Sequence, residues 1–428
     1  MKLHIRAAIL NGTPTDISIT NGRIDSIRPH ANSRAENNSR QIDATGLHVF
    51  PSFRNAHTHV AMVLFRGYGD DMPLMEWLRT RIWPAEAQLT EDDVYAGARL
   101  GMLEMIRGGT TFFNEMYWHR PALVRAAEEL GVRAMIGQTI INAAGEEILR
   151  QQKHELERLA VEEPVSASGR VKLCAAPHSI YTTKPDELRW VSEIAEKYNL
   201  LVHIHLSETQ GEVDDCLRLH GCRPAKLLER SGLMGSNLVA AHGQFLDDDE
   251  LSLLGEAGAS LVTNPAANLK LATGGIFPYA RARDAGIKVC LGTDGAASNN
   301  TLSMIEAMKL AALMAKHREH DATVLPAAEA LDMATTTPAE VFREGSGRIE
   351  VGAPADLILV DFSGPATQPL HDPVSQLVYA ANASCVHTTI CDGQVLMHKG
   401  VVEICDERDV IEQATSAIQG ALSRVHAA

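Results

Sequence analysis

LLVHIHL at residues 200–206 is a short apolar run that carries two histidines, and it is one of eight such runs separated by helix-like stretches. The other seven are LHVFPSFRNAHTH (47–59), TTFFNE (110–115), VRAMIGQ (132–138), VKLCAAP (171–177), NLVAAHG (237–243), SLVTNP (260–265) and KVCLGTD (288–294). Alternation of strands and helices is typical of a parallel sheet. Eight such units over roughly 250 to 300 residues predict an α/β fold with a closed (β/α)8 TIM barrel, and an open doubly wound sheet is the alternative.

Strand-like segments at both ends of the chain predict a second, smaller unit. Residues 1–51 alternate short β-like runs with turns such as Asn21-Gly22, and strand-like runs return over residues 346–405. One composite β-sandwich domain built from both termini is the economical interpretation. The barrel then covers residues 52–345, and the apolar spacing over residues 406–428 predicts a C-terminal helix that docks on it.

Composition and charge argue against several classes of protein. Lys and Arg total 39 against 54 Asp and Glu, and the net charge of −15 would repel a nucleic-acid backbone. No apolar run approaches the roughly 18 residues that a membrane span needs, and the start MKLHIRAAILNG does not resemble a signal peptide. The seven cysteines include no C-x-x-C pair, which is typical of reduced thiols. We therefore expect a soluble cytoplasmic protein without a nucleic-acid polymer or membrane as partner.

Ionisable residues gather where the predicted barrel strands end. His57 and His59 end the first strand, His205 lies in the fifth, His242 ends the sixth and Asp294 ends the eighth. Functional groups of such barrels collect at this face, and buried charge is costly unless it is paired or bound to a metal. Three of these imidazoles and the carboxylate, placed around an open position, would be typical of a catalytic zinc site.

Two histidines of the fifth strand share one face, so the period of the strand does not choose between them. His203 lies two residues deeper than His205, which makes His205 the better ligand and His203 a core histidine. Glu208 lies three residues beyond His205, where loop is expected, and its carboxyl group can hang over a metal without binding it. This position suits a general acid/base that faces the substrate.

Six motifs together resemble one enzyme family. They are NAHTH (55–59), PHSIYT (177–182), HIHLSET (203–209), AHG (241–243), NPAANLKLATG (264–274) and LGTDGAASNN (291–300). The sequence from about residue 46 to residue 360 resembles the amidohydrolase superfamily, in its 5-methylthioadenosine/S-adenosylhomocysteine deaminase branch. The resemblance implies a TIM barrel with a composite β domain and one divalent metal per chain, Zn²⁺ by its donor set, on His57, His59, His205 and Asp294. The fourth strand does not end in a lysine, which disfavours a carboxylated-lysine two-metal site.

The resemblance also implies a reaction, hydrolytic deamination of the adenine ring of 5′-methylthioadenosine and related 5′-modified adenosines. Glu208 would carry a proton from water to a ring nitrogen, while His242 and Asp294 would hold the water and pass a proton to departing ammonia. Glu86 would contact the ribose hydroxyls, and His178 would contact the purine ring. The aromatic residues expected as candidates for stacking on the base are Trp83, Trp118 and Phe65.

One departure from the family bears on the 5′ substituent. Gln138 stands where the family has an arginine for the homocysteine carboxylate, and Arg150 is the candidate for a second such arginine. An amide lacks the charge and the fork of a guanidinium. The sequence therefore favours methylthioadenosine or another 5′-modified adenosine over S-adenosylhomocysteine.

Two alternatives to this activity come from different classes. Another ring aminohydrolase, such as a guanine or cytosine deaminase or a triazine hydrolase, would share the metal site without the ribose contact. A non-catalytic scaffold with an amidohydrolase-like fold would not need a complete set of ionisable residues, and that set argues against it. The expected partner is a small purine nucleoside, and the sequence also allows a homo-oligomer.

Overall fold

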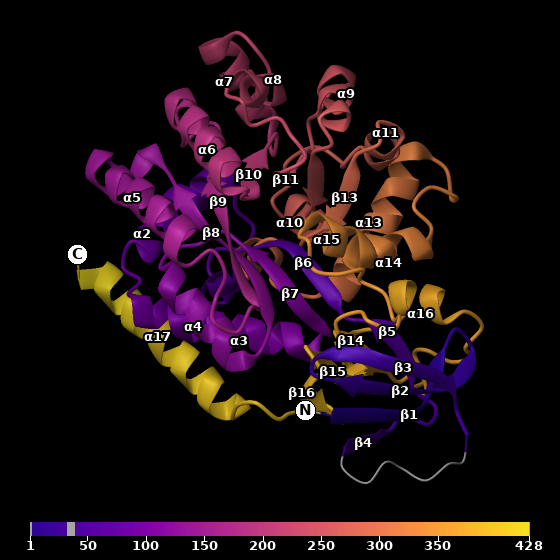
Figure 1. Cartoon of the computed structure of the whole chain (residues 1–428). Helices are drawn as coiled ribbons and strands as arrows, with labels where there is room; N and C mark the ends of the chain where they lie inside the picture. The colour runs from indigo at the N-terminus through magenta and orange to yellow at the C-terminus, as the bar shows by residue number, and fades with distance from the viewer. Residues whose placement is uncertain (1, 32–38, 428) are drawn as a thin grey trace.

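The computed structural model describes residues 2–31 and 39–427, and a parallel eight-stranded sheet forms its larger part (Figure 1). Its strands are β6 (Phe53–Thr58), β7 (Thr110–Glu115), β8 (Arg133–Ile140), β9 (Val171–Pro177), β10 (Val202–Leu206), β11 (Leu238–His242), β12 (Ser260–Thr263) and β13 (Lys288–Leu291). Each strand pairs with the next in chain order. The predicted (β/α)8 barrel is therefore confirmed.

The barrel closes between its first and last strands through hydrogen bonds at their carboxyl ends. Asn55 Nδ2 donates to Thr293 Oγ1 at 2.6 Å, and Asn55 Oδ1 accepts from the Thr293 N–H at 3.0 Å. The backbone N–H groups of Thr293 and Asp294 donate to the His57 carbonyl at 3.2 and 3.0 Å. Closure therefore places Asp294 beside the histidines of β6.

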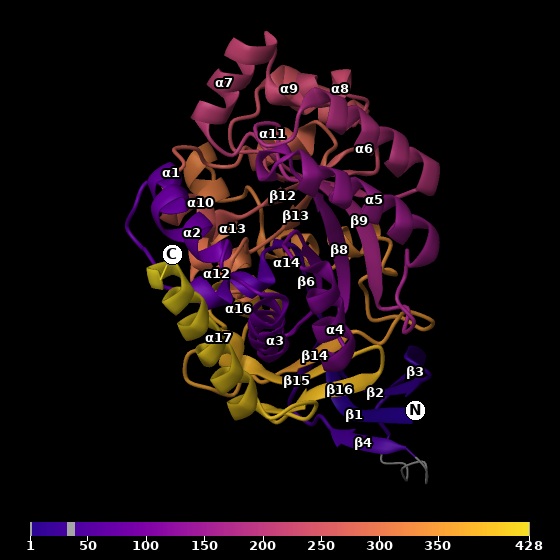
Figure 2. The ribbon, with the colours of Figure 1, turned by 90° about the vertical axis from the view of Figure 1, so that its left-hand side faces the viewer.

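Helices surround the barrel on its outside (Figures 1 and 2). The longer ones are α3 (Glu91–Arg107), α4 (Arg120–Leu130), α5 (Glu146–Glu162), α6 (Pro185–Tyr198), α7 (Gln210–His220), α8 (Pro224–Arg230), α9 (Asp248–Glu256), α13 (Met304–Glu319) and α14 (Ala327–Ala334). Shorter helices are η1 (Val60–Phe65), α1 (Leu74–Trp77), η2 (Leu78–Ile82), α2 (Trp83–Glu86), η3 (Asn142–Ala144), α10 (Pro265–Lys270), α11 (Tyr279–Asp284), α12 (Ala296–Asn299), α15 (Thr336–Val341), α16 (Pro373–Tyr379) and η4 (Ala383–Cys385). Local sequence sets several of these ends: Thr90 and Asp93 form a capping box at the start of α3, and Gly131 ends α4 with a φ of 72°.

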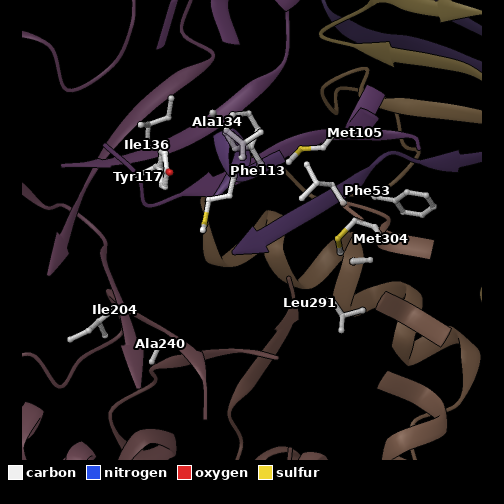
Figure 3. Close-up of a cluster of buried hydrophobic side chains, with 14 of the residues drawn as sticks. Phe53, Met105, Phe113, Tyr117, Ala134, Ile136, Ile204, Ala240, Leu291 and Met304 are labelled. Atoms are coloured by element: carbon white, nitrogen blue, oxygen red, sulfur yellow. The ribbon is translucent and has the colours of Figure 1, made fainter. Parts of the chain in front are cut away.

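Two apolar layers hold the barrel together. The larger lies between strands and helices, and Figure 3 shows Phe53, Phe113, Ile136, Ile204 and Leu291 of this cluster. A smaller cluster consists of buried residues from successive strands and from the region after α15, namely Ala56, Phe112, Met135, Cys174, Leu201, Val239, Val262, Cys290 and Phe342. The barrel strands are thus buried against both layers, as their near-continuous apolar runs require.

The second sheet has nine strands, which come from both ends of the chain as expected. They are β1 (Lys2–Leu10), β2 (Thr13–Thr20), β3 (Arg23–Pro29), β4 (Arg40–Asp43), β5 (His48–Pro51), β14 (Leu357–Val360), β15 (Val386–Cys391), β16 (Gln394–His398) and β17 (Val401–Val402). The termini meet where β5 pairs antiparallel with β14. Asn21 and Gly22 have φ angles of 50° and 77°, which suit the two-residue hairpin turn between β2 and β3.

The C-terminal helix α17 (Glu407–Ala427) runs along the outside of the barrel and packs against α3 (Figure 1). Arg424 Nε donates to the Gln88 carbonyl at 3.0 Å, and its guanidinium also pairs with Asp93. At the other end of α17, Arg107 pairs with Glu407 at 2.8 Å. Among the described residues, no helix is long and apolar enough to span a membrane.

A buried cluster of charges joins the barrel to the second sheet at the start of the barrel strands. Asp356 lies immediately before β14, and its Oδ2 accepts a hydrogen bond from Arg133 Nε of β8 at 2.9 Å. The same oxygen lies 3.6 Å from Arg54 Nη2 of β6. Arg133 also reaches Asp392 at 2.7 Å. The side chains of Arg54 and Asp356 are only 2% and 1% exposed, so each charge depends on the others for compensation.

We expect Asp356→Ala to lower the free energy of unfolding by about 3–5 kcal/mol, because it leaves two buried guanidinium groups without their shared carboxylate. Denaturant unfolding followed by circular dichroism measures the effect. Asp215→Ala is the matched control: Asp215 pairs with Arg218 at 2.8 Å with both side chains more than half exposed, so its loss should cost less than about 1 kcal/mol. Equal, small effects of the two substitutions would show that the buried cluster does not hold the two units together.

Candidate metal centre and active site

Three histidines converge at the carboxyl end of the barrel. His57 is the last residue but one of β6, His59 follows that strand directly, and His205 lies near the end of β10. One ring nitrogen from each lies within 4.8 Å of the other two, and within the described part of the chain this is the one such group of three His, Cys, Asp or Glu residues. By the distances between their ring nitrogens, the structure brings together three of the four ligands expected from the sequence.

Backbone carbonyls orient two of these rings. His59 Nδ1 donates to the Met116 carbonyl at 2.5 Å, and His205 Nδ1 donates to the His178 carbonyl at 2.7 Å. Since a carbonyl can only accept, Nδ1 carries the proton in each neutral ring and Nε2 carries a lone pair. These two Nε2 atoms lie 3.3 Å apart. Nitrogen ligands at about 2.0–2.1 Å from one tetrahedral Zn²⁺ lie about 3.3 Å apart, so the pair fits such an ion.

His57 and Asp294 complete the arrangement. His57 Nδ1 is hydrogen-bonded to His203 Nε2 at 2.8 Å, whereas His57 Nε2 is buried and has no hydrogen-bond partner. Asp294 Oδ1 lies 3.5 Å from His57 Nε2 and 3.3 Å from His59 Nε2. Three ring nitrogens and one carboxylate oxygen therefore face a common point, and an orphaned buried nitrogen is explained if a cation is bound there.

Burial sets the protonation of these groups. It lowers the pKa of His57 to about 4 and lowers the pKa values of His59 and His205. Burial alone would raise the pKa of Asp294, but the neighbouring imidazoles of His57, His59 and His242 hold this pKa below the usual range. Neutral imidazoles and an ionised carboxylate are the forms that bind a metal.

His203 lies behind the cluster, as a core histidine would. It is 1% exposed, and its Nδ1 lies 2.8 Å from Asn114 Nδ2 while Nε2 contacts His57. His203 thus connects the buried side chain of Asn114 to the ring of His57. Such outer contacts fix ring orientation at metal sites.

Glu208 lies at the edge of the cluster, just beyond the end of β10. Its side chain is 8% exposed, and burial raises its pKa. Glu212 holds this turn: its two carboxylate oxygens accept the backbone N–H groups of Ser207 and Glu208, each at 2.9 Å. Glu212 was not expected from the sequence, although its place three residues after the helix-capping Thr209 is the signal of a capping pattern.

His242 ends β11 beside the same cluster. Its ring centroid lies 5.4 Å from that of His57 and 5.5 Å from that of His205. Burial alone would lower the pKa of His242, but the carboxylates of Glu208 and Asp294 raise it. His242 can therefore accept a proton between two acidic groups.

Two of the expected substrate-binding residues lie close to the cluster. The His178 ring centroid is 4.7 Å from that of His205, and burial lowers the pKa of His178 to about 3. Glu86 ends α2 and accepts the Tyr117 hydroxyl at 2.8 Å, while desolvation raises the pKa of Glu86 to about 7. Tyr117 was not expected from the sequence, because nothing in its local pattern points to a residue 31 positions away.

One expectation is wrong: Phe65 was a candidate for stacking on the base, but it is 0% exposed in η1, where it packs in the core. Arg150, the candidate for the substrate carboxylate, has a side chain that is 77% exposed and pairs with Glu147 of the same helix. Its contact with a substrate stays a prediction. The structure keeps Trp83 as a candidate, since its side chain is 44% exposed, and Trp118 is partly buried.

Comparison with known proteins agrees with this geometry. Residues 48–396 match the model of the amidohydrolase family. The chain is 47% identical over 376 residues to a 5′-deoxyadenosine deaminase of Methanoregula boonei, with 88% of this chain and 85% of the relative covered. It is 42% identical over 387 residues to a 5-methylthioadenosine/S-adenosylhomocysteine deaminase of Haloquadratum walsbyi, with coverage of 90% and 87%.

A solved structure has the same fold over the whole length of this chain. An adenosine deaminase from Xanthomonas campestris with bound zinc superposes with a TM-score of 0.90 at 32% identity, covering 100% of this chain and 98% of that one. A triazine hydrolase of 23% identity has a TM-score of 0.87 and shares the fold. From the matched model, the relatives and the barrel with its histidine cluster, we conclude that the chain belongs to the amidohydrolase family.

Proposed function

We propose that this protein is a metal-dependent deaminase that hydrolyses the adenine ring of 5′-methylthioadenosine and related 5′-modified adenosines to the inosine analogue and ammonia. The observation that carries the proposal is the convergence of His57, His59, His205 and Asp294 beside the buried carboxyl group of Glu208. Relatives at 42–47% identity bear the names of deaminases of such nucleosides, which supports the choice of substrate class.

We assign the cofactor as one Zn²⁺ per chain, held by Nε2 of His57, His59 and His205 and by Asp294. The spacing of the ring nitrogens and the orphaned His57 Nε2 support this assignment. When bound, such an ion lowers the pKa of a water molecule from about 16 towards 7, which supplies a nucleophile near neutral pH.

The protein's own groups then move the protons. Glu208, with its pKa raised by burial, takes a proton from the attacking water and delivers it to the ring nitrogen next to the carbon that carries the amino group. His242 and Asp294 hold the attacking oxygen. Once that oxygen is bonded to the ring carbon, His242 takes its remaining proton and passes it to the departing amino group. Water adds to the carbon, the carbon–nitrogen bond breaks, and ammonia leaves.

The nucleoside contacts lie beside this centre. We assign Glu86 to the ribose hydroxyls: Tyr117 occupies one of its oxygens, and the other remains available to the substrate. We assign His178 to the purine ring, because its ring lies against that of His205. Glu86 favours a nucleoside over a free base and so disfavours the alternative of a guanine or cytosine deaminase or triazine hydrolase.

The proposed surroundings of the enzyme follow from charge and cysteine chemistry. The net charge of −15 supports a small-molecule substrate rather than a nucleic-acid polymer. The seven cysteines are free, which supports a cytoplasmic location.

We expect 5′-methylthioadenosine to be deaminated with a higher kcat/KM than S-adenosylhomocysteine, and free adenine to be a poor substrate. The reason is that Gln138 offers no positive charge to a distal carboxylate and Arg150 is exposed on α5. The ultraviolet shift from adenine to hypoxanthine measures each rate. Faster turnover of S-adenosylhomocysteine would contradict the argument from Gln138, and ammonia release from guanine, cytosine or a triazine alone would favour the alternative activity.

We expect Glu208→Gln to retain one zinc per chain and the wild-type thermal midpoint while kcat falls about 10²-fold to 10⁴-fold, the usual contribution of a positioned general acid/base. Metal analysis and steady-state kinetics on one preparation test both parts. Glu193→Gln, at an exposed position on α6, is the control and should leave kcat unchanged. A nearly normal rate for Glu208→Gln would move the proton transfer to another group.

We expect Glu86→Ala to lower kcat/KM for nucleosides about 10-fold to 100-fold, the worth of a hydrogen bond to a charged group, with little effect on 2′,3′-dideoxy analogues. Because its raised pKa is about 7, the Glu86 carboxylate becomes protonated below that pH and accepts hydroxyl protons less well. As pH drops below about 7, the wild-type kcat/KM for nucleosides should therefore fall more steeply than that for the dideoxy analogue, because both substrates share the titration of the metal-bound water and of the acid/base groups but only the nucleoside depends on Glu86. Equal losses for both substrates would make Glu86 structural.

A further inference from the structure

The segment NPAANLKLATG (264–274) supplies two buried amide side chains to one ring nitrogen of His242. Asn264 follows β12 and is 0% exposed, and Asn268 lies in α10 and is 2% exposed. His242 Nδ1 lies 3.1 Å from Asn268 Oδ1 and 3.4 Å from Asn264 Nδ2. The proposed reaction uses His242 but leaves these two amides without a role.

The two contacts demand opposite states of Nδ1. Asn268 Oδ1 can only accept, so it requires a proton on Nδ1, whereas Asn264 Nδ2 can only donate and requires a lone pair there. The contact with Asn268 is the shorter of the two, at 3.1 Å against 3.4 Å for Asn264. In the neutral ring, a proton on Nδ1 leaves the lone pair on Nε2. Nε2 is then the nitrogen of His242 that can accept a proton from the reacting groups.

The backbone around this contact is fixed on both sides. His242 has a φ of 77° and Gly243 a φ of 63°, and the Gly243 N–H donates to the Leu206 carbonyl of β10 at 2.8 Å. On the other side, the Asn268 N–H donates to the Asn264 carbonyl at 3.1 Å, and the Asn268 carbonyl accepts the Thr273 N–H at 3.2 Å. These backbone hydrogen bonds therefore hold Asn268 Oδ1 beside Nδ1 of His242.

We propose that Asn268 is a positioning residue for the deamination: by accepting the Nδ1 proton of His242 it fixes the tautomer in which Nε2 faces the reacting groups. The inference rests on the proposed function, in which His242 takes and returns a proton during ammonia departure. Besides the proposed ligands His57, His59, His205 and Asp294, the titratable groups that act on the ring are Glu208, Glu212, His178 and His203. None of these groups is hydrogen-bonded to Nδ1 in the part of the chain that the structure describes, so the two amides decide the tautomer.

Kinetics of two Asn268 variants test the role of the acceptor. Asn268→Leu removes the oxygen and should lower kcat about 10-fold to 100-fold, a part of the worth of a general acid/base, with little change in KM and with zinc content retained. Asn268→Asp keeps an acceptor oxygen and should restore most of the lost kcat. Asn264→Ala is the matched comparison, since it removes the competing donor and should leave kcat nearly unchanged. A loss with Asn264→Ala and none with Asn268→Leu would overturn the proposal.

The tautomer itself provides a readout that does not depend on activity. In the zinc-loaded wild-type enzyme labelled with ¹⁵N-histidine, and with the His242 signals assigned from their loss in His242→Gln, Nδ1 should carry the proton and Nε2 should not. Asn268→Leu should shift the ring to a mixture of tautomers. A protonated Nε2 in the neutral wild-type ring would overturn the proposal even if the variants do not fold. If no adenine nucleoside is deaminated but the tautomer is as expected, the proposed function fails while the positioning contact stands.

Discussion

The hydrogen bonds that close the barrel between β6 and β13 hold the candidate active site together. The His57 carbonyl accepts the backbone N–H groups of Thr293 and Asp294, so the loop after the last strand is fastened to the end of the first. The same residues supply a ring nitrogen and a carboxylate to the cluster. A chain that failed to close would separate these groups, and formation of the site is therefore coupled to completion of the fold.

Desolvation gives the cluster its chemical character. The imidazoles are buried and neutral, and backbone carbonyls hold the proton of His59 and His205 on Nδ1, so that Nε2 of each is free to bind a cation. The same low exposure raises the pKa of Glu208 towards the range in which a carboxyl group can both accept and return a proton. A site of this kind combines ligands and acid/base groups only because water is largely excluded from all of them.

The residues that we propose to contact the substrate or to orient the acid/base groups lie outside the barrel strands. Glu86 is carried by α2, between β6 and α3, and accepts the hydroxyl of Tyr117, which follows β7. Amides from the segment after β12 reach His242 at the end of β11. In the proposed reaction, the ends of the barrel strands present the reacting groups, and the connections at their carboxyl ends contact the substrate and orient those groups, which is the usual division of roles in such barrels.

Local sequence signals were enough to predict the barrel and the hairpin at Asn21-Gly22, and to place His203 deeper in its strand than His205. Each depends on periodicity, on turn chemistry or on depth along one strand, and all of these are local properties of the chain. The resemblance to amidohydrolases added the predictions that Glu86 contacts the ribose and that His178 contacts the purine ring.

Contacts between segments far apart in the chain were decided by the tertiary structure. Nothing local marks Phe65 as fully buried or Tyr117 as the partner of Glu86. The sequence determined which side of each strand a residue occupies, because side chains alternate along a strand. Only the closed barrel decided which loops meet above those strands, because that depends on how every strand and helix between them packs.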